Sequence, residues 1–163
     1  MTDYKFDPKI LKNHFDNKIR ELCKSCKRYG TKATCPPHIE SVEYYRELLP
    51  RYSHGILFVE KFKSNSLTNW KELGERSSLK IHNQLTGVRD ELFAHGKLSI
   101  VFGAGSCKLC KECAFPCRFP DKSIVPIEGT GLNVVDFVKE VADIDVSFPV
   151  SKYFYRVGVV LYD

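Results

Sequence analysis

The 163-residue chain contains no run of about 18 consecutive apolar residues, so we expect no helix that spans a membrane. Its first seven residues, Met1 to Asp7, contain no apolar run and no small-residue cleavage site of the kind found in secretory signal peptides. We therefore expect the protein in the cytoplasm. Because that compartment is reducing, we do not expect its cysteines to form structural disulfides.

Several catalytic motifs are missing too. Gly103 and Gly105 follow an apolar run, but no lysine followed by Ser or Thr lies at the offset that a phosphate-binding loop needs. We find no obvious Ser-His-Asp set and no carboxylate pair. There is also no internal repeat, low-complexity tract or linker, and 43% of the residues are hydrophobic and 28% charged. This composition is typical of one soluble domain over residues 1–163.

What the chain does contain is cysteine, in two short segments that hold all seven. The first segment reads C-x2-C-x8-C and consists of Cys23, Cys26 and Cys35. The second reads C-x2-C-x2-C-x3-C and consists of Cys107, Cys110, Cys113 and Cys117. Cysteines at such spacing are typical of metal centres, so all seven are candidate metal ligands.

The second segment has the spacing with which bacterial ferredoxins bind a 4Fe-4S cluster. Short two-residue steps allow successive thiolates to reach separate irons of one cube. Ferredoxins have a proline directly after the fourth cysteine, whereas here Arg118 follows Cys117 and the proline is Pro120, which leaves the role of Cys117 open. Zinc is the alternative, but four thiolates within residues 107–117 are crowded for one tetrahedral ion. The spacing therefore favours iron and sulfide.

The first segment supplies only three thiolates, and three allocations stay open. The chain could hold one ferredoxin-type cluster and a separate three-thiolate site. It could hold two clusters, with Cys117 crossing over to complete the first set as in two-cluster ferredoxins, so that the second cluster keeps an open iron. It could also hold one cluster and a zinc ion completed by His38, which lies three residues after Cys35. We expect the remaining histidines to serve in packing or on the surface.

The two segments carry a resemblance to a known family. Residues 23–37 read CKSCKRYGTKATCPP, residues 107–124 read CKLCKECAFPCRFPDKSI, and residues 131–135 read GLNVV. In these motifs the chain resembles prokaryotic proteins described as predicted metal-binding, domain of unknown function 2284, which are common in anaerobic bacteria and archaea. The resemblance covers the chain from about residue 20 onward. It implies metal binding and no particular reaction.

Hydrophobic periodicity predicts an α+β fold in a single domain, with a small mixed β-sheet flanked by helices and a cysteine-rich metal-binding loop region. The predicted helices are residues 7–22, 41–49, 65–94 and 133–141, and the predicted strands are residues 55–59, 98–102 and 153–162. We expect the long helix to return strand 98–102 beside strand 55–59. Both cysteine segments should then meet at one edge of the sheet.

The function that we expect is electron transfer by a 4Fe-4S protein with one or two clusters and a redox partner protein. Alternatives are an enzyme in which an open iron acts as a Lewis acid, and a zinc-stabilised interaction domain. For the enzyme, the best candidates for substrate contacts are Tyr29, Lys32 and Thr34. The net charge is +5, but Lys and Arg are spread among acidic residues, so we do not expect a nucleic acid partner.

The ferredoxin-type spacing makes a direct prediction for Cys110. The Cys110→Ala variant should lose most of its iron and sulfide, because one iron of the cluster would lack its thiolate. Iron and acid-labile sulfide per chain, measured on protein purified without oxygen, test this. An iron content equal to that of the wild type would contradict the ferredoxin-type assignment.

Overall fold

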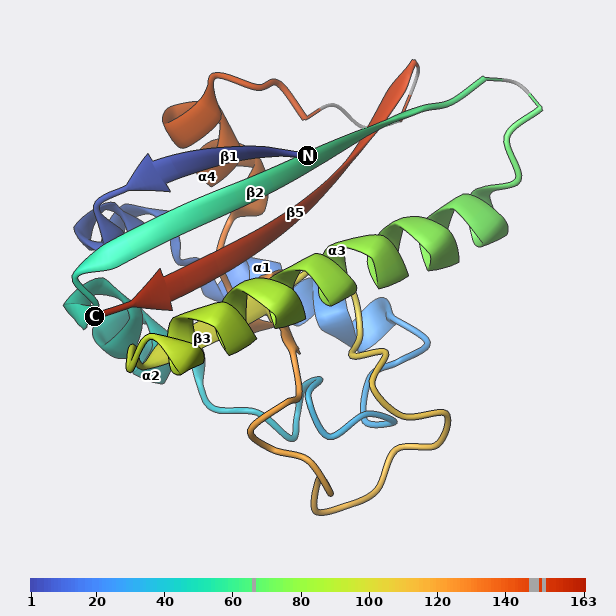
Figure 1. Ribbon diagram of the computed structural model, residues 1–163. Helices are drawn as coiled ribbons and strands as arrows, with labels where there is room; N and C mark the ends of the chain where they lie inside the picture. The colour runs from blue at the N-terminus through green and yellow to red at the C-terminus, as the bar shows by residue number, and fades with distance from the viewer. Residues whose placement is uncertain (66, 147–149, 151) are drawn as a thin grey trace.

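The computed structural model describes residues 1–65, 67–146, 150 and 152–163, and it confirms the predicted α+β fold with a mixed sheet (Figure 1). Five strands form one sheet in the order β1-β2-β5-β3-β4. Their bounds are Thr2–Phe6 for β1, His54–Lys63 for β2, Ser99–Gly103 for β3, Val125–Pro126 for β4 and Tyr153–Tyr162 for β5. The β3–β4 pair is parallel and the other pairs are antiparallel.

Strand β5 is the centre of the sheet and is buried on both faces. It pairs with β2 over ten residues and with β3 over four. Val157, Val159 and Leu161 belong to one hydrophobic core, and Val160 belongs to a second core on the opposite face. The β-branched, apolar sequence of this strand suits a position with neighbours on both edges and both faces.

One face of the sheet is covered by α3, which spans Trp70–Ala94 (Figure 1). It begins after Asn69, whose side chain accepts a hydrogen bond from the Glu72 N–H, and it runs without interruption through Gly74 and Gly87. Ile81 and Leu85 of α3 are fully buried against Val160. In the described part of the chain, no helix is both long and apolar enough to cross a bilayer.

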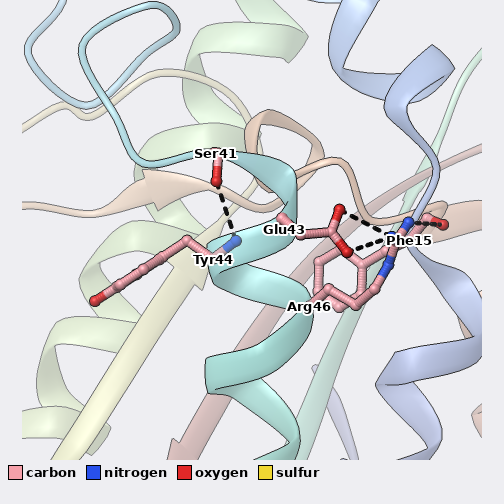
Figure 2. A network of polar contacts seen from close by, with 5 residues as sticks. All are labelled: Phe15, Ser41, Glu43, Tyr44 and Arg46. Atoms are coloured by element: carbon pink, nitrogen blue, oxygen red, sulfur yellow. Dashed lines mark hydrogen bonds and ion pairs between the residues drawn. The ribbon is translucent and has the colours of Figure 1, made fainter.

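The opposite face is covered by shorter elements. They are the 3-10 helix η1 at Pro8–His14, α1 at Asn17–Leu22, α2 at Val42–Leu48 and α4 at Val134–Ala142, with the 3-10 helix η4 at Ile127–Thr130. Ser41 caps α2 as expected, since its hydroxyl accepts from the Tyr44 N–H at 3.1 Å (Figure 2). Arg46 of α2 pairs with Glu43 and donates to the Phe15 carbonyl, which ties α2 to the segment before α1.

The prediction of one helix over residues 7–22 is wrong, because the segment is divided at Phe15. Asp7 and Asp16 each cap a separate start, of η1 and α1 respectively. Phe15 between them is extended and forms an isolated bridge with Leu132. The Asp16 N–H also donates to the Gly131 carbonyl at 2.9 Å. Long-range backbone contacts with residues 131–132 therefore override the helical periodicity.

The predicted order of strands is also wrong in one respect. Strand β3 does not lie beside β2, because β5 is inserted between them and pairs with both. Strands β1 and β4 were not predicted. For β1 a signal exists in the alternation of Tyr4 and Phe6, both partly buried against the core, with exposed polar residues. Strand β4 has two residues and no periodicity to detect.

The turn that joins η4 to α4 requires glycine at position 131. Gly131 has a φ of +90°, and a β-carbon there would lie 2.7 Å from Val42 Cγ2. We expect Gly131→Ala to lower the free energy of unfolding by at least about 2 kcal/mol, from backbone strain and overpacking together. Urea denaturation measures this.

Gly87→Ala is the matched control for this substitution. Gly87 lies in α3 with open space around its α-carbon, so alanine there should be neutral or stabilising by up to about 1 kcal/mol. Equal unfolding free energies for the two variants would show that the 131 position tolerates a side chain.

Candidate metal centre

The cysteines lie on two loops that contact each other at one end of the sheet (Figure 1). The first loop begins where α1 ends, at Cys23, and the second begins where β3 ends, at Gly103. The Ala33 N–H of the first loop donates to Cys113 Sγ of the second at 3.2 Å. The His38 ring packs on Phe115 with 4.6 Å between ring centroids. The two cysteine segments therefore meet, as the sequence predicted.

Consecutive tight turns shape the first loop. The Cys26 N–H donates to the Cys23 carbonyl at 3.0 Å, and the Cys35 N–H donates to the Lys32 carbonyl at 3.0 Å. The Gly30 N–H donates to the Pro36 carbonyl at 2.9 Å, which closes the loop on itself, and Gly30 has a φ of +70°. These turns direct the thiols of the first segment toward one cavity.

The cavity has a volume of about 280 Å³ and is lined by all three cysteines of the first segment. Its other walls are mostly apolar, with Ile19 and Leu22 from α1 and Pro126 from β4. Gly105 and Ser106, directly before Cys107, line it as well, and so does Glu128 of η4. The first segment and the residues directly before the second therefore line one cavity, together with a single carboxylate and the Arg28 side chain.

Burial dominates the acid–base properties of this cavity. Together with Cys26, Cys23 and Glu128 nearby, and with Lys32 opposing, burial raises the pKa of the Cys35 thiol to about 11. Burial, followed by Glu128, also raises the pKa of Cys23. The pKa of the Glu128 carboxyl is itself raised by burial. A bound cation would reverse each of these shifts, because it stabilises thiolate and carboxylate forms.

The described side chains do not form a preassembled site for a single ion. Among the described residues, no three His, Cys, Asp or Glu side chains converge closely enough to hold one metal ion. A tetrahedral zinc site requires every sulfur at about 2.3 Å from one point. The three thiols instead surround a space far larger than the roughly 10–15 Å³ that admits one water molecule. The donor set and the space fit a group of several atoms whose separate metals each take one thiolate.

The second loop has no regular helix or strand between Ala104 and Pro120. Its four cysteines are all partly buried. Cys107 lines a separate cavity of about 200 Å³ together with His82, whose pKa is lowered to about 4 by burial and by Lys108. Cys113 is the residue whose sulfur contacts the first loop. The crossing over of Cys117 stays a prediction.

The structure separates the remaining sequence candidates. His38 is exposed, its Nε2 lies 3.1 Å from the Gly30 carbonyl, and it is not among the residues that line the cavity. Tyr29 lines the cavity. Thr34 is buried, and its hydroxyl has no hydrogen-bond partner in the part of the chain that the structure describes. Lys32 is partly buried, and its charge lowers the pKa of Lys108.

Glu128 is the cavity residue that the sequence analysis missed. Its only sequence signal is an acidic residue between apolar neighbours, Pro126-Ile127 before it and Gly129 after it. Such a signal does not identify a ligand, because it lies more than 90 residues from the first cysteine segment and gives no spacing motif. Only the fold brings Glu128 to Cys23 and Cys35.

An α+β fold with seven cysteines on two contacting loops defines a cysteine-rich protein with the donor set of a metal centre. The chain belongs to the family described as "predicted metal-binding protein" (DUF2284), whose model matches residues 9–162. This match confirms the resemblance seen in the cysteine motifs. No curated protein and no solved structure matches the chain.

The raised pKa of Cys35 predicts slow alkylation in the metal-free protein. Thiolates react and thiols do not, so a pKa of about 11 against the ordinary 9.0 gives about 100-fold less reactive form at about pH 8. Iodoacetamide labelling followed by peptide mass spectrometry should show Cys35 reacting at least about 100-fold more slowly in the folded protein than in urea. Equal rates in the two states would contradict the burial of this thiol.

Proposed function

We propose that this protein carries a 4Fe-4S cluster on Cys107, Cys110, Cys113 and Cys117 and transfers electrons to or from a partner protein. The observation that carries the proposal is the contact between the two cysteine loops at one end of the sheet, where the Ala33 N–H donates to Cys113 Sγ. The ferredoxin-type spacing lies on a loop that also carries exposed apolar side chains. A cluster on such a loop is within reach of a docked partner.

Hydrogen bonds to sulfur support an iron–sulfur centre. Backbone N–H groups donate to Cys113 Sγ from Ala33 at 3.2 Å and to Cys26 Sγ from Arg28 at 3.4 Å. Such bonds stabilise thiolates, and in iron–sulfur proteins they help to set the reduction potential. They are present here on both loops.

Positive charge beside the loops also supports an iron–sulfur centre. Lys108 is partly buried, and its pKa is lowered by burial and then by Arg28 and Lys32, with Glu75 opposing. Cations that crowd one another in this way are costly unless negative charge lies among them. A cluster with four thiolate ligands would supply that negative charge.

The surface around the second loop suits a protein partner. Leu109, Phe115 and Phe119 are about half exposed, at 47%, 52% and 48%. Lys111 and Arg118 beside them are exposed and basic. Glu112 on the same loop is exposed too, so the charges around these apolar side chains are mostly but not wholly basic. This surface favours docking of a partner whose own surface is mainly acidic.

A second candidate function is favoured by the enclosed cavity of the first loop. A cluster held there by only three cysteines would have one iron free to act as a Lewis acid on a small substrate. The cavity has apolar walls and the Tyr29 side chain at its edge. Electron transfer remains the primary proposal, because only the second loop carries a complete four-cysteine set.

Metal analysis tests the proposed function directly. Protein purified without oxygen should contain about four irons and four sulfides per chain, or about eight of each if both loops hold clusters. Its visible band at about 400 nm should bleach with dithionite and return on reoxidation without loss of iron. Zinc in the absence of sulfide would refute the proposal and favour a zinc-stabilised domain.

A further inference from the structure

We propose that the carboxylate of Glu128 is the fourth ligand of a metal cluster held by Cys23, Cys26 and Cys35. This inference rests on the proposed iron–sulfur function. It supplies the fourth ligand that the three thiolates of the first loop lack. Neither the cysteine motifs nor the family description includes this residue. The site is the 280 Å³ cavity, which Glu128 lines together with the three thiols.

The backbone around Glu128 holds it against the first loop. The position of a β-carbon at Gly129 would be in van der Waals contact with the first loop, 3.4 Å from Ile39 Cδ1 and 3.6 Å from Pro36 Cδ. Pro36 directly follows Cys35 and also lines the cavity. The residue after Glu128 therefore lies against the segment that carries the buried thiol.

A second contact holds η4 against the helix that carries Cys23. The Asp16 N–H, at the start of α1, donates to the Gly131 carbonyl at 2.9 Å, while Asp16 Oδ1 caps α1. Cys23 is the C-terminal cap of this helix. Both ends of the three-thiol set are therefore fixed relative to Glu128.

Hydrogen bonds from backbone N–H groups hold the Glu128 side chain in the cavity. Oε1 accepts a hydrogen bond from the Gly105 N–H at 3.1 Å. Among the described residues, the carboxylate forms no ion pair with Lys, Arg or His, and Arg156 acts on it only from a longer distance. A metal ion beside the three thiols would give this carboxylate a direct cationic partner.

The ligand set has a chemical consequence. Three thiolates and one carboxylate give one metal of the cluster an oxygen ligand, which a small substrate can displace more readily than a thiolate. A four-thiolate electron carrier on the second loop and a cluster with one exchangeable position on the first would serve different roles.

The decisive variant is Glu128→Gln in the full chain. Its amide oxygen can still accept from the Gly105 N–H, so the structural hydrogen bond is retained while the anionic ligand is lost. We expect EDTA to remove iron at least about tenfold faster from this variant than from the wild type. Losing even a residue that only hydrogen-bonds to a ligand weakens metal binding by about tenfold or more, and Glu128 is proposed to be a ligand itself. The electron paramagnetic resonance spectrum of the dithionite-reduced protein should also change.

Glu128→Cys is the second variant, and Glu47→Gln is the matched control. A thiolate at 128 should keep the iron and give a spectrum with cysteine-only ligation, which a merely structural role for Glu128 would not produce. Glu47 is exposed on α2 and remote from the cavity lining, so the same change of charge there should leave both readouts unaltered.

The outcomes separate the two proposals. Wild-type protein with iron and sulfide, together with unchanged spectra and iron release in both Glu128 variants, would overturn the Glu128 assignment alone. Wild-type protein with zinc and no sulfide would overturn the iron–sulfur function. In that case Glu128→Gln should still release zinc to EDTA at least about tenfold faster, and an unchanged rate would overturn the ligand assignment as well.

Discussion

The antiparallel pairing of β5 with both β2 and β3 is the constraint on which the rest of the structure depends. The ten-residue ladder with β2 and the four-residue ladder with β3 make the last strand of the chain the centre of the sheet. Each fully buried aliphatic side chain of β5 contributes about 1.5–3 kcal/mol to folding. Because β3 is fixed against this strand, the second cysteine loop leaves the sheet at a defined point, beside Gly103.

The second constraint is the contact of the N-terminal region with residues 131–132. The Asp16 N–H bonded to the Gly131 carbonyl and the Phe15–Leu132 bridge place α1 over η4. Since α1 ends at Cys23, this contact brings the first cysteine loop to the same end of the sheet as the second. The cavity then forms between two segments, each anchored by backbone hydrogen bonds in its own right.

Acidic and basic groups lie close together around the two loops. In the cavity, burial raises the pKa values of Cys23, Cys35 and Glu128, and basic side chains nearby oppose these shifts only in part. Lys108 and Arg28 crowd each other beside the loops. A thiolate-bound metal cluster would stabilise the buried acidic groups and supply negative charge to the cations.

The sequence by itself determined the metal-binding character, the α+β class and most of the elements, because cysteine spacing and hydrophobic periodicity are local properties. Strand 153–162, helix 133–141 and the cap at Ser41 agree with the structure to within one or two residues. Only the tertiary structure decided the strand order, the break at Phe15 and the place of Glu128. These depend on pairing between residues far apart in the chain, such as Phe15 with Leu132 and Gly105 with Glu128, and no local pattern encodes such pairing.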